Sequence, residues 1–261
     1  MCKEKMLDKV GRYEFVADAF HCDFRHELFL GHLGNHMLNA ADFHSSDREF
    51  GMRYLNSINK TWVLSRLAIE MSEMPREGEH FFVETWVSSA MRYFTNRNFR
   101  IVSPEGKVYG YGQSIWAMID TVTRQPYDIL SVNDGAICQW IEAEKECPIE
   151  KGSRVKIDSD AKRVATINTH YSDIDVNGHV NSVKYIEHVL DLFSLDLYKD
   201  SRIERIDVAY VAESYFGDTL HLDLKEDSEK EYSCRIAKTQ PDNAEETEVC
   251  RAKVRFAERN K

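Results

Sequence analysis

The sequence lacks any apolar run long enough to cross a membrane, and its other absences exclude further classes of protein. A membrane-spanning helix needs about 20 apolar residues in succession, and no stretch of the 261 residues approaches this length. The first ten residues, MCKEKMLDKV, contain neither the apolar core of a secretion signal nor the Arg/Ser-rich, acid-poor composition of a transit peptide. We therefore expect a cytoplasmic protein without a membrane partner.

Closely spaced cysteines and an excess of basic residues are also missing. The six cysteines lie far apart, without the short spacings of a zinc knuckle or of a disulfide framework, so we expect reduced thiols. The net charge is −10, whereas a protein that binds nucleic acid needs a basic surface. We therefore expect no nucleic-acid partner.

What is present is one order of elements that occurs twice. An aromatic-rich strand at 12–20, a helix at 32–43 and four β-rich runs are followed by a strand at 163–171, a second helix and four more strands. We interpret this pattern as an internal duplication. The predicted boundaries are 1–130 for the N-terminal domain, 131–160 for the linker and 161–261 for the C-terminal domain.

Aligning the two halves suggests where a site lies. The strands align when Gly78 is set against Gly217, and the helices align when His36 is set against His179. In these registers polar residues of the second half fall opposite residues of other types, which points to a single site in the second half. The pairs are Asp175 with His32, Asn177 with Gly34, and Glu213 with Met74.

Each of the polar residues also has a purely structural interpretation. Asn177 can cap the following helix, which stabilises it by about 1 kcal/mol, and Asp175 can favour the positive end of the helix dipole. His179 alone can be an ordinary first-turn residue. Glu213 is harder to explain in this way, because a carboxylate beside an apolar strand is costly to bury unpaired. Together the four residues favour a functional site.

The motif D-x-N-x-H-V-N at 175–181, followed by VKYIEHVLD and a strand that ends in ES-YFGDTL, resembles the acyl-ACP thioesterases of bacteria and plants. RLAIEMSEMPREGEHFFVETWVSS and SIWAMIDTVTRQP are similar to the N-terminal domain of that family, so the likeness covers nearly the whole chain. It implies an α+β fold, the tandem (double) hot-dog, in which each unit is a long helix wrapped by an antiparallel β-sheet. It also implies hydrolysis of fatty acyl-ACP to free fatty acid and ACP without a cofactor, with the acyl chain in the N-terminal domain.

The resemblance implies Asp175, Asn177, His179 and Glu213 as the catalytic group. Our hypothesis is that Glu213 activates water with help from Asp175, while His179 orients the water or protonates the thiolate. Asn177 would hold the loop and touch the substrate. The backbone N–H groups of Gly178, His179 and Val180, free at a helix N-terminus, would bind the oxyanion.

A covalent mechanism is the alternative, with Ser214 as the nucleophile and His179 as its base. Many plant relatives carry Cys at the position of Ser214, and no nucleophile elbow surrounds it here. A metal is a further alternative, because His32 and His36 are spaced to share a helix face. No third ligand is indicated, so we expect no metal.

The expected partner is an acyl carrier protein. Carrier proteins are acidic, so an enzyme of net negative charge needs a local basic patch; a solvated linker is the other interpretation of the basic residues near 151–163. Rival functions are an acyl-CoA thioesterase and a non-catalytic fatty-acyl-binding module, and the chain can be a monomer (a pseudo-dimer) or a homodimer. The candidate carrier contacts are Lys151, Arg154, Lys156, Lys162 and Arg163.

Overall fold

The structure is a computed structural model that describes residues 7–152, 155–157 and 160–259. The chain divides into two compact units. Unit 1 comprises Met1–Leu28, Asn35–Val63 and Pro75–Ile149, and unit 2 comprises Phe29–Gly34, Leu64–Met74 and Glu150–Lys261. In the part of the chain that is described, no helix combines the length and the apolar character needed to cross a membrane.

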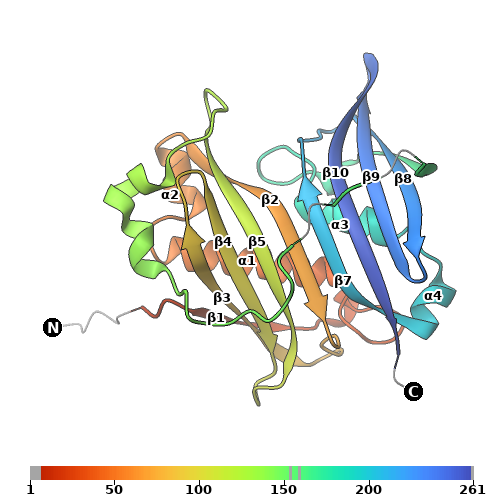
Figure 1. Ribbon diagram of the computed structural model, residues 1–261, viewed down its shortest axis with the longest axis horizontal. Coiled ribbons are helices and arrows are strands. Elements are labelled where there is room, and N and C mark those ends of the chain that lie inside the picture. The colour runs from red at the N-terminus through yellow and green to blue at the C-terminus, as the bar shows by residue number, and fades with distance from the viewer. Residues whose placement is uncertain (1–6, 153–154, 158–159, 260–261) are drawn as a thin grey trace. The chain divides into compact units, whose positions relative to one another are not determined.

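Unit 1 is an antiparallel sheet packed on one long helix (Figure 1). The strand order is β1-β3-β4-β5-β2, and α1 runs behind the strands. Two short helical segments, α2 and η2, follow α1 and β5 respectively. The elements are β1 (Gly11–Val16), η1 (Ala19–His21), α1 (Leu30–Ser46), α2 (Met52–Ser57), β2 (Lys60–Met71), β3 (His80–Ala90), β4 (Phe94–Val102), β5 (Val108–Asp120) and η2 (Ile129–Trp140).

The core of unit 1 forms because α1 presents one apolar stripe to the sheet. Met37 and Ala40 are fully buried on the helix, and Phe81, Trp86 and Phe99 are fully buried on the strands. Burying an aromatic or large aliphatic side chain stabilises the fold by about 1.5–3 kcal/mol. The observed helix is longer than the predicted 32–43, because it begins at Leu30 and continues to Ser46.

Unit 2 repeats the arrangement with a shorter helix. The strand order is β7-β10-β9-β8-β6, and residues 66–70 of β2 pair antiparallel with β7. Figure 1 shows α3 behind β9 and β10. The elements are β6 (Lys162–Asn168), η3 (Tyr171–Asp173), α3 (Ser182–Leu190), α4 (Leu195–Asp200), β7 (Ser201–Tyr210), β8 (Thr219–Ser228), β9 (Glu231–Gln240) and β10 (Asn243–Glu258).

The first turn of α1 belongs to unit 2 and packs against α3. A side chain at Gly31 would place its Cβ 2.8 Å from Glu187 Cγ, and one at Gly34 would place it 3.5 Å from Val183 Cγ2. A larger residue at position 31 would therefore force the Glu187 side chain to shift. On α3 itself Ile186 is fully buried and faces the core of unit 2.

Candidate active site

A tight loop between η3 and α3 carries three of the four predicted catalytic residues. Asp175 Oδ1 accepts hydrogen bonds from the backbone N–H groups of Asn177, at 2.8 Å, and His179, at 3.3 Å. The backbone N–H of Asp175 donates in turn to the carbonyl of His179 at 2.8 Å. Gly178 has a φ of +81°, which a glycine adopts without strain. The aspartate thus fixes the conformation from which His179 projects.

The fourth predicted residue reaches the same place from the connection that follows β7. Val180 N–H donates to the carbonyl of Ser214 at 2.8 Å, which ties the loop to this connection. As a result Glu213 Oε1 lies 3.5 Å from His179 Nδ1. Both side chains are about one quarter exposed, with relative accessibilities of 29% and 26% respectively. The structure therefore brings His179 and Glu213 together at a position that solvent and substrate can reach.

Asn177 lies at the exposed tip of the loop. Its backbone N–H is held by Asp175, while its side-chain amide has no hydrogen-bond partner among the described residues. The predicted capping role of Asn177 is wrong. The cap of α3 is Asn181, whose Oδ1 accepts the N–H of Val183 at 2.8 Å.

The prediction of free backbone donors for an oxyanion is also wrong in this structure. Gly178 N–H donates to the Asp175 carbonyl at 3.0 Å, while His179 N–H and Val180 N–H donate to the two acceptors named above. The physical reason is that a turn occupies this stretch and the helix begins only at Ser182. The three amides stabilise the turn and are not the unpaired donors of a helix end.

The position of Ser214 argues against the covalent alternative. The residue is fully buried, and its Oγ is shielded from solvent. A nucleophile must contact the thioester carbon, and this hydroxyl faces the interior of unit 2. The contribution of Ser214 that the structure shows is its carbonyl, which holds Val180.

Unit 1 contains a second copy of the same loop, and this corrects the predicted register of the repeat. In each loop an aspartate Oδ1 accepts the N–H groups of the residues two and four positions later, at 2.8 and 3.1 Å for Asp23 and at 2.8 and 3.3 Å for Asp175. Leu28 N–H donates to the Pro75 carbonyl at 2.9 Å, just as Val180 donates to Ser214. The counterpart of Asp175 is therefore Asp23 and not His32.

In the corrected register the two loops differ at fewer of the predicted site positions. Opposite Asn177 stands Arg25 rather than Gly34, and opposite His179 stands Glu27 rather than His36. The predicted strand register agrees with the structure, because Gly78 and Gly217 both have positive φ at matching turns. Met74 is consequently the counterpart of Glu213. An aspartate shapes the loop in each unit, Asp23 in unit 1 and Asp175 in unit 2, whereas the imidazole of His179 and the Glu213 carboxylate that faces it occur at these positions in unit 2 only.

Tyr215 is a residue of this site that the sequence reasoning missed. Its hydroxyl donates to Glu213 Oε2 at 3.0 Å, and its ring meets the His179 ring edge-on with centroids 5.1 Å apart. The available signal was the spacing, since residues two apart in an extended segment project to the same side.

The candidate carrier contacts fall into three groups. Lys151, Lys156 and Lys162 are exposed, and Arg154 lies outside the described residues. Arg163 is engaged within unit 2: its guanidinium bonds Asp223 at 2.9 Å and Glu246 at 2.7 Å. These ion pairs, that to Glu246 first, raise the pKa of Arg163 above its ordinary value. Its charge is thus compensated locally.

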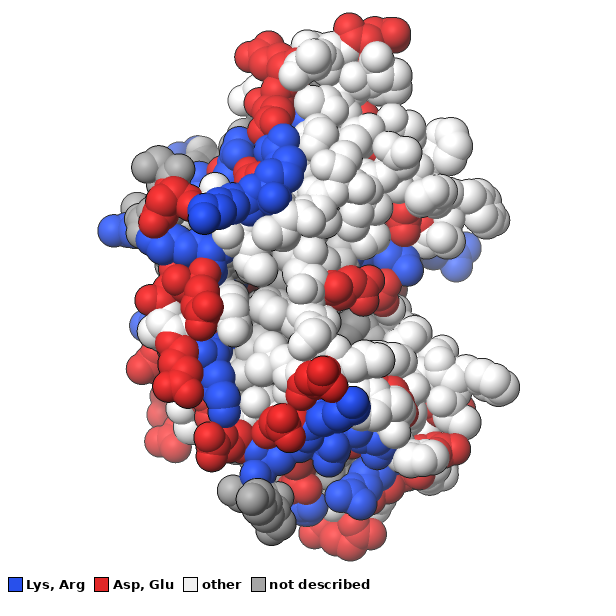
Figure 2. All heavy atoms as spheres, turned by 90° about the vertical axis from the view of Figure 1, so that its right-hand side faces the viewer, with Lys and Arg blue, Asp and Glu red and all other residues white. Residues whose placement is uncertain are grey.

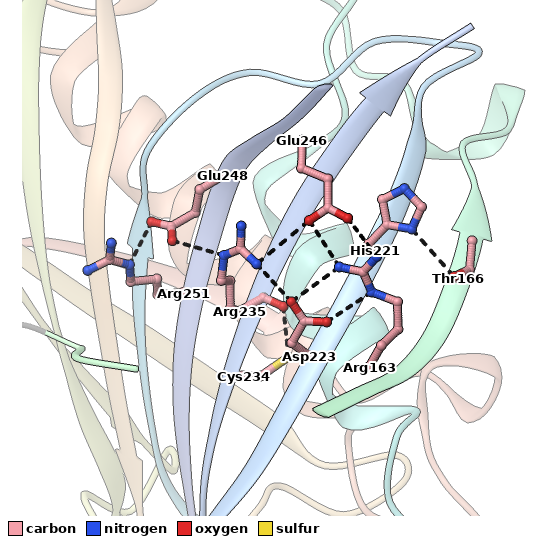
Figure 3. A network of polar contacts seen from close by, with 9 residues as sticks. All are labelled: Arg163, Thr166, His221, Asp223, Cys234, Arg235, Glu246, Glu248 and Arg251. Carbon is pink, nitrogen blue, oxygen red and sulfur yellow. Dashed lines mark hydrogen bonds and ion pairs between the residues drawn. The ribbon is translucent and has the colours of Figure 1, made fainter. Parts of the chain in front are cut away.

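Arg163 is one end of a network that crosses the outer face of the sheet of unit 2 (Figure 3). Arg235 bonds both Asp223, at 2.9 Å, and Glu248, at 3.3 Å, and Glu248 continues to Arg251 at 2.6 Å. Figure 2, which faces the right-hand side of Figure 1, shows basic and acidic atoms lying close together, beside a broad area that carries neither. On that face the charge is mixed.

Metal ligands do not gather anywhere in the described part of the chain: no group of three or more His, Cys, Asp and Glu side chains is arranged to hold an ion. His36, one of the residues considered for a metal, packs between Phe15 and Phe81 at centroid distances of 4.5 and 5.6 Å. Cys22, Cys138, Cys147, Cys234 and Cys250 are free thiols, and Cys2 lies outside the described residues.

Comparison with known proteins assigns the family. Residues 9–133 match the family model of the acyl-ACP thioesterase N-terminal domain, and residues 155–258 match that of the C-terminal domain. The chain belongs to the acyl-ACP thioesterase family. The crystal structure of an acyl-ACP thioesterase from Bacteroides thetaiotaomicron is 51% identical, with a TM-score of 0.88 over 95% of this chain and 98% of that one.

More distant members of this family share the fold. The 12:0-ACP thioesterase from Umbellularia californica has 20% identity and a TM-score of 0.82, over 97% of this chain and 99% of that one. The palmitoyl-acyl carrier protein thioesterase of Gossypium hirsutum is 28% identical over 156 residues, which are 58% of this chain but only 38% of the relative's own length. The predicted α+β tandem hot-dog fold is confirmed.

Proposed function

We propose that the chain hydrolyses the thioester of fatty acyl-ACP, releasing a free fatty acid and the carrier thiol. The observation that carries the proposal is the pairing of His179 with Glu213 beside an exposed loop amide, in a chain of this family. The reaction needs a base for water, a donor for the developing oxyanion and an open position for the thioester. Unit 2 offers all three.

In the proposed reaction the Glu213 carboxylate removes a proton from water as the oxygen attacks the thioester carbon. The carbon–sulfur bond then breaks, and the departing thiolate takes up a proton, which His179 can relay from Glu213. Asn177 donates its free side-chain amide to the carbonyl oxygen, because the nearby backbone amides are already engaged. Asp175 acts through the loop that it shapes and is not itself the base.

We propose that the acyl chain binds in the N-terminal domain, 1–130, and that catalysis belongs to the C-terminal domain, 161–261. Unit 1 contains a cavity of about 50 Å³ that opens to solvent. Trp62, Val87 and Ile137 are among its apolar lining residues, and Arg97 adds a polar end. Burial lowers the pKa of Arg97 to about 9, so the guanidinium stays charged at neutral pH and limits the depth open to an alkyl chain.

The proposed partner is an acyl carrier protein, approached by the exposed lysines 151, 156 and 162 rather than by Arg163. All four catalytic candidates lie in unit 2, so a monomer contains a whole site and a homodimer would contain two. We also propose a cytoplasmic location, in which the free thiols would remain reduced.

A thiol-release assay with matched acyl-ACP and acyl-CoA substrates tests the proposal. We expect hydrolysis of acyl-ACP with a clearly higher kcat/KM than for acyl-CoA of the same chain length. Preference for acyl-CoA would favour the first rival function. Binding of the acyl chain with no thiol release from either substrate would favour a fatty-acyl-binding module.

A further inference from the structure

We propose that Tyr215 is a positioning residue that fixes the orientation of the Glu213 carboxylate for water activation; this inference rests on the proposed function. The two carboxylate oxygens are divided between two partners. Oε2 accepts the Tyr215 hydroxyl at 3.0 Å, and Oε1 lies 3.5 Å from His179 Nδ1. A carboxylate held at one oxygen presents the other in a fixed direction.

Tyr215 can act in this way because a buried frame holds its backbone. Its N–H donates to Asp218 Oδ2 at 2.9 Å, and its carbonyl accepts the Thr169 hydroxyl at 2.8 Å. Asp218 also pairs with Lys238 Nζ at 2.9 Å, and both side chains are more than nine-tenths buried. A backbone anchored to such a pair fixes the point from which the Tyr215 side chain projects toward Glu213.

The aromatic ring is held as well as the backbone. Lys238 Nζ lies 4.9 Å from the centroid of the Tyr215 ring on one side, and the His179 ring meets it edge-on. Edge-to-face pairing and a cation over a ring each favour one orientation of the aromatic group. Tyr215 is therefore in contact with both members of the catalytic pair, through its ring with the imidazole and through its hydroxyl with the carboxylate.

Unit 1 shows that the frame does not by itself require a tyrosine. The counterpart of Tyr215 is Arg76, whose N–H donates to Glu79 Oε2 at 2.9 Å in the way that Tyr215 donates to Asp218. Met74, two residues before Arg76, stands at the position that Glu213 has in the second half of the repeat. The turn therefore forms with an arginine as well as with a tyrosine. The phenol of Tyr215 occurs in the copy of the turn that also has the Glu213 carboxylate as its acceptor.

The test is a comparison of Tyr215→Phe with wild type in acyl-ACP hydrolysis. Phenylalanine keeps the ring packing and removes only the donor. We expect kcat to fall about tenfold, the value of one hydrogen bond to a charged group, with KM within about twofold. Tyr198→Phe is the matched control, because it removes a phenol that donates to the Leu190 carbonyl at 2.7 Å, away from the site; its kcat should equal that of wild type.

Measuring Tyr215→Phe in a Glu213→Asp protein as well as in wild type distinguishes a positioning role of Tyr215 from a purely structural one. Glu213→Asp withdraws the carboxylate from the phenol, so adding Tyr215→Phe to it should change kcat less than about twofold. A wild-type kcat for Tyr215→Phe, or an equal tenfold loss in both backgrounds, would overturn the inference. If wild type does not hydrolyse acyl-ACP, the proposed function fails. The contact between Tyr215 and Glu213 is then tested by urea unfolding of wild type, the two single variants and the double variant. Changes in unfolding free energy that do not add support the contact, and changes that add refute it.

Discussion

At the residue scale, the two aspartates at the start of the repeated loops have the same structural role. Asp23 and Asp175 each hold two backbone N–H groups through one carboxylate oxygen. An oxygen in this role closes a turn that would otherwise leave the donors to water. The aspartate in the D-x-N-x-H motif therefore has a sufficient reason to be there without taking part in proton transfer.

The duplicated loop allows a matched prediction. Asp23→Ala and Asp175→Ala should each lower the free energy of unfolding by about 1–2 kcal/mol, because each removes the acceptor of two hydrogen bonds. Only Asp175→Ala should reduce acyl-ACP hydrolysis, since only its loop positions His179. Urea unfolding and steady-state kinetics on the two variants measure both effects. Equal losses of activity in Asp23→Ala and Asp175→Ala would contradict the assignment of catalysis to the loop of Asp175.

At the element scale, the end of α1 carries a histidine that is kept neutral by its surroundings. His44 is fully buried, and its Nε2 lies 3.0 Å from the Lys9 carbonyl. Burial first, and then the positive charge of Arg97 on β4, lower the pKa of His44 to about 2. The packing of α1 on β4 is therefore incompatible with an imidazolium at this position.

This contact makes stability depend on pH. Between pH 6.5 and 2 the unfolded chain binds a proton at His44 while the folded chain does not, so stability falls as the pH falls below about 6.5. At pH 5 the loss from this residue should be about 2 kcal/mol. His44→Gln, which retains a donor for the Lys9 carbonyl, should reduce the difference in unfolding free energy between pH 7 and pH 5 by that amount. An unchanged difference in urea titrations at the two pH values would refute the assignment.

Periodicity predicted the elements of each unit well but misplaced where the helices begin. The apolar positions of α1 and α3 repeat at helical spacing, and so do the buried residues of the structure. The start of α3 was placed too early because Asn177 and Asn181 are both good caps, and only the turn built by Asp175 decides between them. The predicted helix register of the repeat was wrong for a related reason. It set His36 against His179 because both are histidines, whereas the true register follows from the hydrogen bonds of the loop, which the sequence does not reveal.

Of the site, sequence supplied the chemical groups but not all of their roles. His179 and Glu213 were predicted to meet, and the structure places them 3.5 Å apart. Tyr215 was missed because its role depends on the direction of one hydroxyl. The occupied amides of 178–180 were missed because a turn and a first helical turn share the same residue types.

At the scale of the whole molecule, the two units share one arrangement of helix and sheet but contain different functional groups. Unit 1 has the cavity, lined by α1 and the sheet, and unit 2 has the imidazole and carboxylate. If the acyl chain occupies the cavity, its volume should set the chain-length preference. Selectivity and turnover would then respond to substitutions in different units.

Filling the cavity tests this separation. Leu38 lies on α1 and lines the cavity, so Leu38→Trp should lower kcat/KM for palmitoyl-ACP by at least about tenfold more than for octanoyl-ACP, an energy of about 1.4 kcal/mol. Leu130→Trp, at a residue 40% exposed, is the control and should leave the preference unchanged. A uniform loss with all chain lengths would place the acyl chain elsewhere.

The most direct measurement of the central claim is the rate of acyl-ACP hydrolysis by Glu213→Gln beside that of Met74→Gln, at the counterpart position in the first half of the repeat. Glutamine can still accept the Tyr215 hydrogen bond but cannot take a proton from water. We predict that Glu213→Gln loses about 10²–10⁴-fold in kcat with an unchanged melting temperature, while Met74→Gln retains the wild-type rate. A Glu213→Gln variant that hydrolyses acyl-ACP as fast as wild type would contradict the account.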